Sequence, residues 1–113
     1  MPFLSYFITP KGLAEYGPED FKAAITADNA KVIDVRTKSE FVHGHIDNAT
    51  HVPLSDLRNH IGNLDKNAKY YLICATGHRS RAAATILLKN GFSNVSHLKG
   101  GMLAWNKINR RKQ

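Results

Sequence analysis

The chain has 113 residues and a mass of 12.6 kDa, enough for one domain with a hydrophobic core and too little for two. Its 42% of hydrophobic residues is ordinary for a globular protein, and its single cysteine excludes an internal disulfide. The formal net charge is +7, from 16 Lys and Arg against 9 Asp and Glu. We therefore treat residues 1–113 as a single domain with a weak attraction for small anions.

Both ends of the chain are treated as additions to that domain. The first 16 residues match no clear helix or strand pattern and form an N-terminal extension. They contain neither a basic, cleavable leader nor the roughly 20 apolar residues that span a bilayer, so we expect a cytoplasmic protein with no membrane partner. Residues 106–113 form a basic tail. No aromatic platform or nucleic-acid module accompanies its charge, so we interpret it as a solvated, frayed terminus and expect no nucleic-acid partner.

Helix and strand signals alternate from residue 17 onward. Residues 17–20, Gly-Pro-Glu-Asp, predict a helix start followed by an apolar stripe at helical spacing. Residues 32–35 form a β-branched run typical of a buried strand. Residues 37–40, Thr-Lys-Ser-Glu, match a capping box at the start of a second helix, which Gly44 keeps short.

The middle of the chain predicts two strands and one helix. Residues 51–54 indicate a brief strand, which ends at Pro53 because proline donates no ladder hydrogen bond. Ser55 is expected to cap a third helix whose apolar face carries Leu57, Ile61 and Leu64. Residues 70–73, Tyr-Tyr-Leu-Ile, predict the next strand.

The last third of the chain repeats this alternation. A helix is predicted over Arg81–Asn90 with Gly91 as its C-terminal cap, followed by a strand over residues 95–98. Gly100-Gly101 then turns the chain into a final helix carrying Met102 and Trp105. Strands that alternate with helices predict an α/β domain with a mostly parallel sheet.

The only cysteine, Cys74, lies between the predicted strand 70–73 and the helix after it. Ligands of open parallel sheets bind at the carboxyl ends of the strands, where loop amides and the first helical turn can converge on an anion. Gly77 supplies the backbone freedom that such a loop needs. The pattern predicts a strand–loop–helix cradle with sulfur at its base.

Charge near the cysteine favours a reactive thiolate over a merely buried thiol. Half ionisation at neutral pH needs about 2 kcal/mol relative to a free thiol, and a helix dipole supplies only about 0.3–1 kcal/mol. The remainder must come from His78, Arg79, Arg81 and amide hydrogen bonds. A phosphatase loop has C-x5-R spacing, whereas Cys74 and Arg79 are spaced C-x4-R. The shorter loop suits one transferred sulfur atom better than a phosphoryl group.

Between about residues 17 and 105 the chain resembles the single-domain sulfurtransferases of the rhodanese family. The resemblance is carried by ordered blocks: Asp34–Arg36, Glu40–Ile46 with Ala49 and Val52–Leu54, Tyr71–Ser80, and Gly91-Phe92 through Gly100-Gly101 to Ala104-Trp105. It implies a five-stranded, mostly parallel sheet with helices on both faces. It also implies that Cys74 takes a sulfane sulfur from a small anionic donor such as thiosulfate. The persulfide would then pass its sulfur to cyanide in an assay, or to a cellular thiol or protein.

The resemblance also suggests roles for individual residues. The main-chain amides that would hold the outer sulfur belong to Ala75, Thr76, Gly77, His78, Arg79 and Ser80. Arg79 would attract an anionic donor, although a solvated helix-start cation is the alternative. Arg81 would add to the field or make a structural pair. Asp34 and Arg36 are interpreted as a supporting, structural pair near the base of the loop.

No cofactor or metal is expected. His45 with His43 and His51 lacks a carboxylate or second cysteine to complete a ligand set, so we expect His45 to bond a backbone carbonyl near the interior.

Two other functions stay open beside the enzyme. With no second thiol to form a disulfide, a persulfide on Cys74 must pass its sulfur outward, so a sulfur-carrier or docking module for a protein partner is one alternative. A phosphatase or arsenate-type reductase on the same scaffold is the other. We expect a monomer or a weak dimer.

Overall fold

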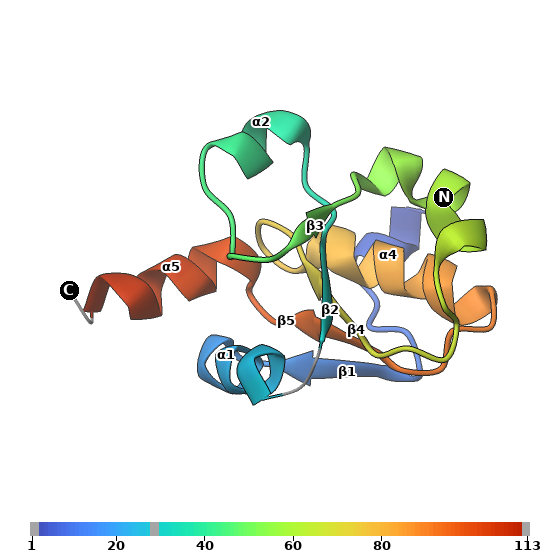
Figure 1. Ribbon diagram of the computed structural model, residues 1–113, viewed down its shortest axis with the longest axis horizontal. Helices are drawn as coiled ribbons and strands as arrows, with labels where there is room; N and C mark the ends of the chain where they lie inside the picture. Colours follow the sequence, from blue (N-terminus) through green and yellow to red (C-terminus); the bar gives the residue numbers. More distant parts are fainter. Residues whose placement is uncertain (1–2, 28–29, 112–113) are drawn as a thin grey trace.

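The computed structural model describes residues 3–27 and 30–111 and contains a five-stranded sheet, as Figure 1 shows. The strands are β1 (Leu13–Tyr16), β2 (Lys31–Asp34), β3 (Thr50–His51), β4 (Tyr70–Ile73) and β5 (Val95–Leu98). They lie in the order β1-β5-β4-β2-β3, and every neighbouring pair is parallel. The predicted α/β fold with a parallel sheet is confirmed.

Helices cover both faces of this sheet (Figure 1). The longer ones are α1 (Pro18–Ala27), α4 (His78–Lys89) and α5 (Gly101–Arg111), and the shorter ones are α2 (Lys38–Val42) and α3 (Leu57–His60). Three 3₁₀ turns complete the fold: η1 (Phe3–Tyr6), η2 (Leu54–Asp56) and η3 (Ile61–Asn63). Helix α4 packs on β4 and β5, and α1 packs on α5.

The hydrophobic core has two halves because side chains alternate across each strand. On the α4 side, Leu72 and Cys74 pack with Leu87 and other buried residues. On the opposite side, Tyr71 and Ile73 pack with Phe21, Leu98 and Met102. Cys74 directly follows β4, so its side chain continues the alternation onto the α4 face.

Several local predictions are confirmed in detail. The Thr37–Glu40 capping box forms, with each side chain bonded to the other's backbone amide. At the end of α4, Gly91 has φ 90°, the Gly91 amide donates to Leu88 O, and the Phe92 amide donates to Leu87 O. This is the Schellman pattern expected of a glycine just beyond a helix end.

Other boundaries differ from the prediction. Strand β3 covers only Thr50–His51, and the predicted third helix is a succession of η2, α3 and η3. Ser55 lies inside η2 and caps nothing, since α3 follows Asp56 without a side-chain cap. Only Leu57 of the expected apolar face is fully buried, whereas Ile61 and Leu64 pack at the edge of the core. So short a segment depends on contact with the sheet rather than on helix propensity.

Both ends of the chain also differ. Residues 13–16, for which no element was predicted, form edge strand β1 beside β5. The basic segment is helical through Arg111 as part of α5, so it is not a frayed coil up to that residue. Helix α4 begins at His78, three residues before the predicted start, because Gly77 ends the loop in a left-handed conformation with φ 99°.

Candidate active site

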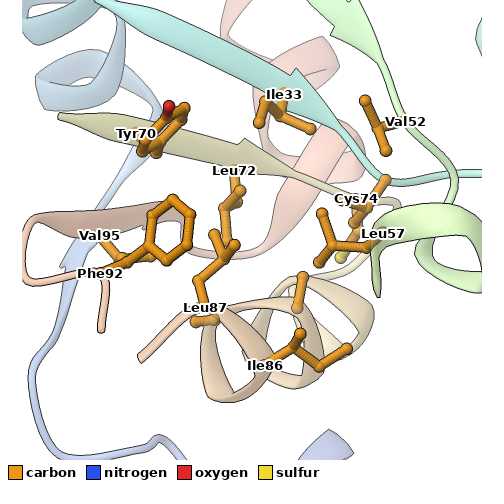
Figure 2. Packing of buried hydrophobic residues seen from close by; sticks show 13 residues of the cluster. Ile33, Val52, Leu57, Tyr70, Leu72, Cys74, Ile86, Leu87, Phe92 and Val95 are labelled. Atoms are coloured by element: carbon orange, nitrogen blue, oxygen red, sulfur yellow. The ribbon is translucent and has the colours of Figure 1, made fainter. Parts of the chain in front are cut away.

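Cys74 lies at the carboxyl end of β4 with its sulfur facing the start of α4 (Figure 2). Its exposed fraction is 1%, and it belongs to the core cluster that includes Val52 and Leu57. The Gly77 amide donates to Sγ over 3.0 Å. The thiol is therefore buried among hydrocarbon groups but has a main-chain hydrogen-bond donor on its polar side.

Of the predicted ring of loop amides, the hydrogen bond from Gly77 to Cys74 Sγ is the one observed among the described residues. The left-handed Gly77 turns its amide back toward the sulfur three residues earlier. His78, Arg79 and Ser80 form the first turn of α4, where amides have no partner within the helix. Thr76 Oγ1 lies 3.0 Å from His78 Nδ1. Binding of an outer sulfur by all the amides from Ala75 to Ser80 stays a prediction.

Helix α5 holds the base of the loop from the other side. The Met102 amide donates to Cys74 O over 2.9 Å, and the Leu103 amide donates to Ala75 O over 3.0 Å. Gly101 permits this approach, because a Cβ there would lie 2.4 Å from Ala75 C and 2.5 Å from Cys74 O. The Gly100-Gly101 pair therefore positions the cysteine loop as well as turning the chain.

Arg79 pairs with Glu40 of α2 and not directly with the sulfur. Its guanidinium makes two hydrogen bonds to the Glu40 carboxylate, of 2.7 and 2.8 Å. This pairing lowers the pKa of Glu40 to about 2 and raises that of Arg79. Glu40 also closes the capping box of α2, so a single carboxylate fixes both the helix start and the direction of Arg79.

Arg79 also lines a cavity of about 330 Å³. Arg58 supplies a second guanidinium there, and the apolar side includes Val35 and Leu54. The remaining lining residues are Tyr6, Thr37, Pro53 and Ser55. A cavity with two cationic side chains suits an anionic ligand.

Asp34 and Arg36 form a buried ion pair at the carboxyl end of β2. The Asp34 side chain has 0% exposure, and its Oδ2 lies 2.7 Å from Nη2 of Arg36. The Arg36 backbone amide also donates to Asp34, and its guanidinium donates to Gly44 O. The pair thus ties the chain leaving β2 to Gly44 in the loop after α2.

A chain of polar contacts runs from the buried sulfur to Glu15 at the sheet edge. Ser80 Oγ lies 3.5 Å from Cys74 Sγ and 2.6 Å from His97 Nδ1. His97 Nε2 lies 2.9 Å from a carboxylate oxygen of Glu15 on β1. His97 has 0% exposure, and its burial lowers its pKa although Glu15 opposes this shift. The hydrogen bond from His97 in turn lowers the pKa of Glu15.

The sequence analysis did not find His97 or Glu15. His97 was interpreted only as part of a strand, and Glu15 lay in the unassigned segment. A polar residue inside a buried strand is a possible signal, but its partner follows only once β1 is paired with β5. Arg81, expected to add to the field or make a structural pair, lies 4.0 Å from Glu15.

The three histidines considered for a metal each bond a backbone carbonyl: His43 to Ser39, His45 to Phe41 and His51 to Arg36. His45 is exposed rather than near the interior, because its ring stacks outside Phe41. Residues 3–27 and 30–111 contain no cluster of three His, Cys, Asp or Glu suited to a metal ion.

Comparison with protein families gives a match to the rhodanese-like domain over residues 17–108. The chain belongs to the rhodanese-like family. Its Cys74 loop therefore sits on a rhodanese-like scaffold, with β1 lying just before the matched region.

The chain is also similar to proteins with curated names. The putative sulfur carrier protein YrkF of Bacillus subtilis is 33% identical over 94 residues, which are 82% of this chain and 51% of that protein. The thiosulfate sulfurtransferase GlpE of Pseudomonas entomophila is 37% identical over 82 residues, 73% of this chain and 75% of that one. The chain thus spans about half the length of the Bacillus protein.

Among solved structures, the chain is similar to a rhodanese-related protein from Thermoplasma volcanium. The TM-score is 0.74 at 34% identity, covering 84% of this chain and 92% of that one. Across the portion of the chain that the structure describes, none of the helices has the length and apolarity needed to cross a membrane.

Proposed function

We propose that the protein is a sulfurtransferase that carries sulfane sulfur as a persulfide on Cys74. The observation that carries this proposal is the Gly77 amide, 3.0 Å from the only sulfhydryl of the chain, at the carboxyl end of a rhodanese-like sheet. An amide donor favours the charged form of a thiol and also the charged end of a persulfide. A cysteine that served only as a core residue does not require such a donor.

The reaction has two steps. The Cys74 thiolate attacks the outer sulfur of a donor such as thiosulfate, and sulfite leaves with the bonding electrons. A nucleophilic acceptor then takes the outer sulfur and releases the thiolate, which predicts ping-pong kinetics. Cys74 is 1% exposed, so the proposed reaction requires neighbouring groups to move before a substrate reaches the sulfur.

An anionic donor is favoured by the charge around this loop. Arg79 and Arg58 line the neighbouring cavity, and Glu40 neutralises only one of the two guanidiniums. The hydrogen bonds of the Arg79 guanidinium go to the Glu40 carboxylate of α2. Arg79 thus attracts an anionic donor by long-range electrostatics. Its guanidinium can bind the donor directly only after its hydrogen bonds to Glu40 break.

A sulfur-carrier role is the second candidate, because one relative is named a putative sulfur carrier protein. In that case the same persulfide forms, but a partner protein rather than a small thiol takes the sulfur. The acceptor half-reaction separates the two candidates. Rapid turnover with cyanide or small thiols supports the enzyme, whereas a stable persulfide that they discharge slowly supports the carrier.

The experiment that tests the proposal is intact-protein mass spectrometry after exposure to thiosulfate. We expect a gain of about 32 Da, one sulfur atom, that cyanide removes. Cys74→Ser should show no gain and no thiosulfate:cyanide activity. If the wild-type mass stays unchanged, or Cys74→Ser retains full activity, the proposal is wrong. Hydrolysis of p-nitrophenyl phosphate without any gain in mass would instead support a phosphatase.

A further inference from the structure

When His97 is a neutral imidazole, the donors and acceptors along the polar chain from Cys74 through Ser80 and His97 to Glu15 fit a single direction. The Glu15 carboxylate accepts hydrogen bonds, so His97 Nε2 must carry a proton to make its 2.9 Å contact. In the neutral imidazole, Nδ1 is then an acceptor for the Ser80 hydroxyl at 2.6 Å. The Ser80 oxygen is in turn free to accept from the Cys74 thiol at 3.5 Å.

We infer that His97, positioned by Glu15, takes up the Cys74 proton through the Ser80 hydroxyl when the thiol becomes a nucleophile. The S–H bond breaks as an O–H bond forms at Ser80, and the former Ser80 proton moves to His97 Nδ1. The result is a thiolate, an unchanged hydroxyl and an imidazolium. No proton leaves the protein and no further reactant is needed.

The imidazolium that forms has a partner for each of its protons. Nε2–H remains on the Glu15 carboxylate, and the new Nδ1–H donates to Ser80 Oγ. The Ser80 hydroxyl then donates to the thiolate or to Gly77 O, 3.1 Å away. Cys74 thus gains a hydrogen-bonded counter-charge where the loop itself presents a single amide bond to the sulfur.

The other charged groups facing His97 oppose the imidazolium. Arg81 on α4 and Lys99 after β5 both act against its charge, as does burial. Glu15 on β1 is the anion that offsets them, and its side chain keeps 28% exposure. His97 is therefore neutral in the resting protein at neutral pH, which is the state needed to receive a proton.

This inference extends the proposed function, since sulfur transfer requires a thiolate in the first step. The positioning role of Glu15 and His97 can nevertheless be tested without sulfur transfer. The rate at which iodoacetamide alkylates Cys74 measures its thiolate fraction, and the chain has no second cysteine to interfere. The pH dependence of that rate is the readout.

The variants are Glu15→Gln and His97→Gln in the full chain. We expect the midpoint of the pH–rate profile to rise by about one pH unit in each variant. Glu15→Gln removes the opposite charge in contact with His97, and His97→Gln removes the proton acceptor itself. The limiting rate at high pH should stay within about twofold of wild type, because a fully ionised thiol needs no proton acceptor. Glu15 is partly exposed at the sheet edge, so its variant keeps the fold if His97→Gln does not.

Ser96→Ala is the matched control, because Ser96 is buried on the same strand and adjacent to His97. Alternation along the strand turns its side chain to the opposite sheet face, away from Ser80. Its midpoint should equal that of wild type. If the Glu15→Gln midpoint also coincides with wild type, the inference is wrong.

The two proposals fail in different ways. If a persulfide forms on Cys74 after exposure to thiosulfate but all the alkylation profiles coincide, the proton route is wrong and the sulfurtransferase proposal stands. If the pH–rate profiles for alkylation shift but no persulfide forms, the proton route is supported and the proposed sulfurtransferase function is wrong.

Discussion

Substitution of Gly101 by alanine tests whether α5 positions the cysteine loop. Gly101 has φ 60°, and a Cβ there would lie 2.4 Å from Ala75 C and 2.5 Å from both Ala75 O and Cys74 O. A left-handed backbone costs an alanine about 1–2 kcal/mol. Relief of the contacts requires the loop and α5 to separate by about 1 Å, and overpacking of this kind costs about 1–3 kcal/mol.

We therefore expect Gly101→Ala to lower the free energy of unfolding by about 2–5 kcal/mol. In a domain of this size that is a fall in Tm of about 4 °C per kcal/mol. Urea denaturation followed by circular dichroism measures the first quantity, and thermal unfolding measures the second. The displaced loop should also change the rate at which iodoacetamide alkylates Cys74.

Gly62→Ala is the matched control, because a Cβ at Gly62 meets nothing within 4 Å and its φ is not positive. Its free energy of unfolding should stay within about 0.5 kcal/mol of wild type. Equal stability of Gly101→Ala and Gly62→Ala would show that Gly101 does not hold α5 against the loop.

Two further substitutions test the ion pairs beside the loop. Pairing with Arg79 lowers the pKa of Glu40 from 4.5 to about 2, so Glu40 stabilises the fold above pH 4.5, and this contribution is lost as pH falls toward 2. Solvent screening limits this contribution to about 1 kcal/mol. Urea denaturation across that pH range should show that the free energy of unfolding falls less steeply with pH in Glu40→Gln than in wild type. Parallel pH dependences in the two proteins would contradict the prediction. Asp34→Asn leaves the buried Arg36 guanidinium without its anion and should cost about 3 kcal/mol in urea denaturation at pH 7. A loss below about 1 kcal/mol would mean that Gly44 O and the new amide satisfy Arg36 unaided.

The Arg79–Glu40 pair affects both the acid stability of the fold and the positive charge available to an anionic donor. Arg79 is the cation nearest in sequence to the Cys74–Gly77 loop, and Glu40 holds it through two hydrogen bonds. Loss of Glu40 would free that guanidinium and increase the positive charge available to an anionic donor. The Glu40→Gln variant therefore tests donor affinity as well as acid stability, through the KM for thiosulfate.

Features that depend on near neighbours in the chain were predictable from the sequence. The Thr37–Glu40 capping box, the Gly91 cap and the strands 70–73 and 95–98 each result from residues within a few positions of one another. The same holds for Cys74 at the carboxyl end of β4, since strand and loop adjoin. Short-range sterics and hydrogen bonds determine such features whatever the rest of the chain does.

Features that depend on distant partners were decided by the tertiary structure alone. Glu15 meets His97 across 82 positions, and Arg79 meets Glu40 across 39. The sequence of strand β1 has no strong strand pattern, and the strand forms because its backbone pairs with β5. Sequence patterns over a few residues do not determine which distant side chain the folded sheet places beside a buried imidazole. The chain of contacts from Cys74 through Ser80 and His97 to Glu15 is therefore seen only in the structure.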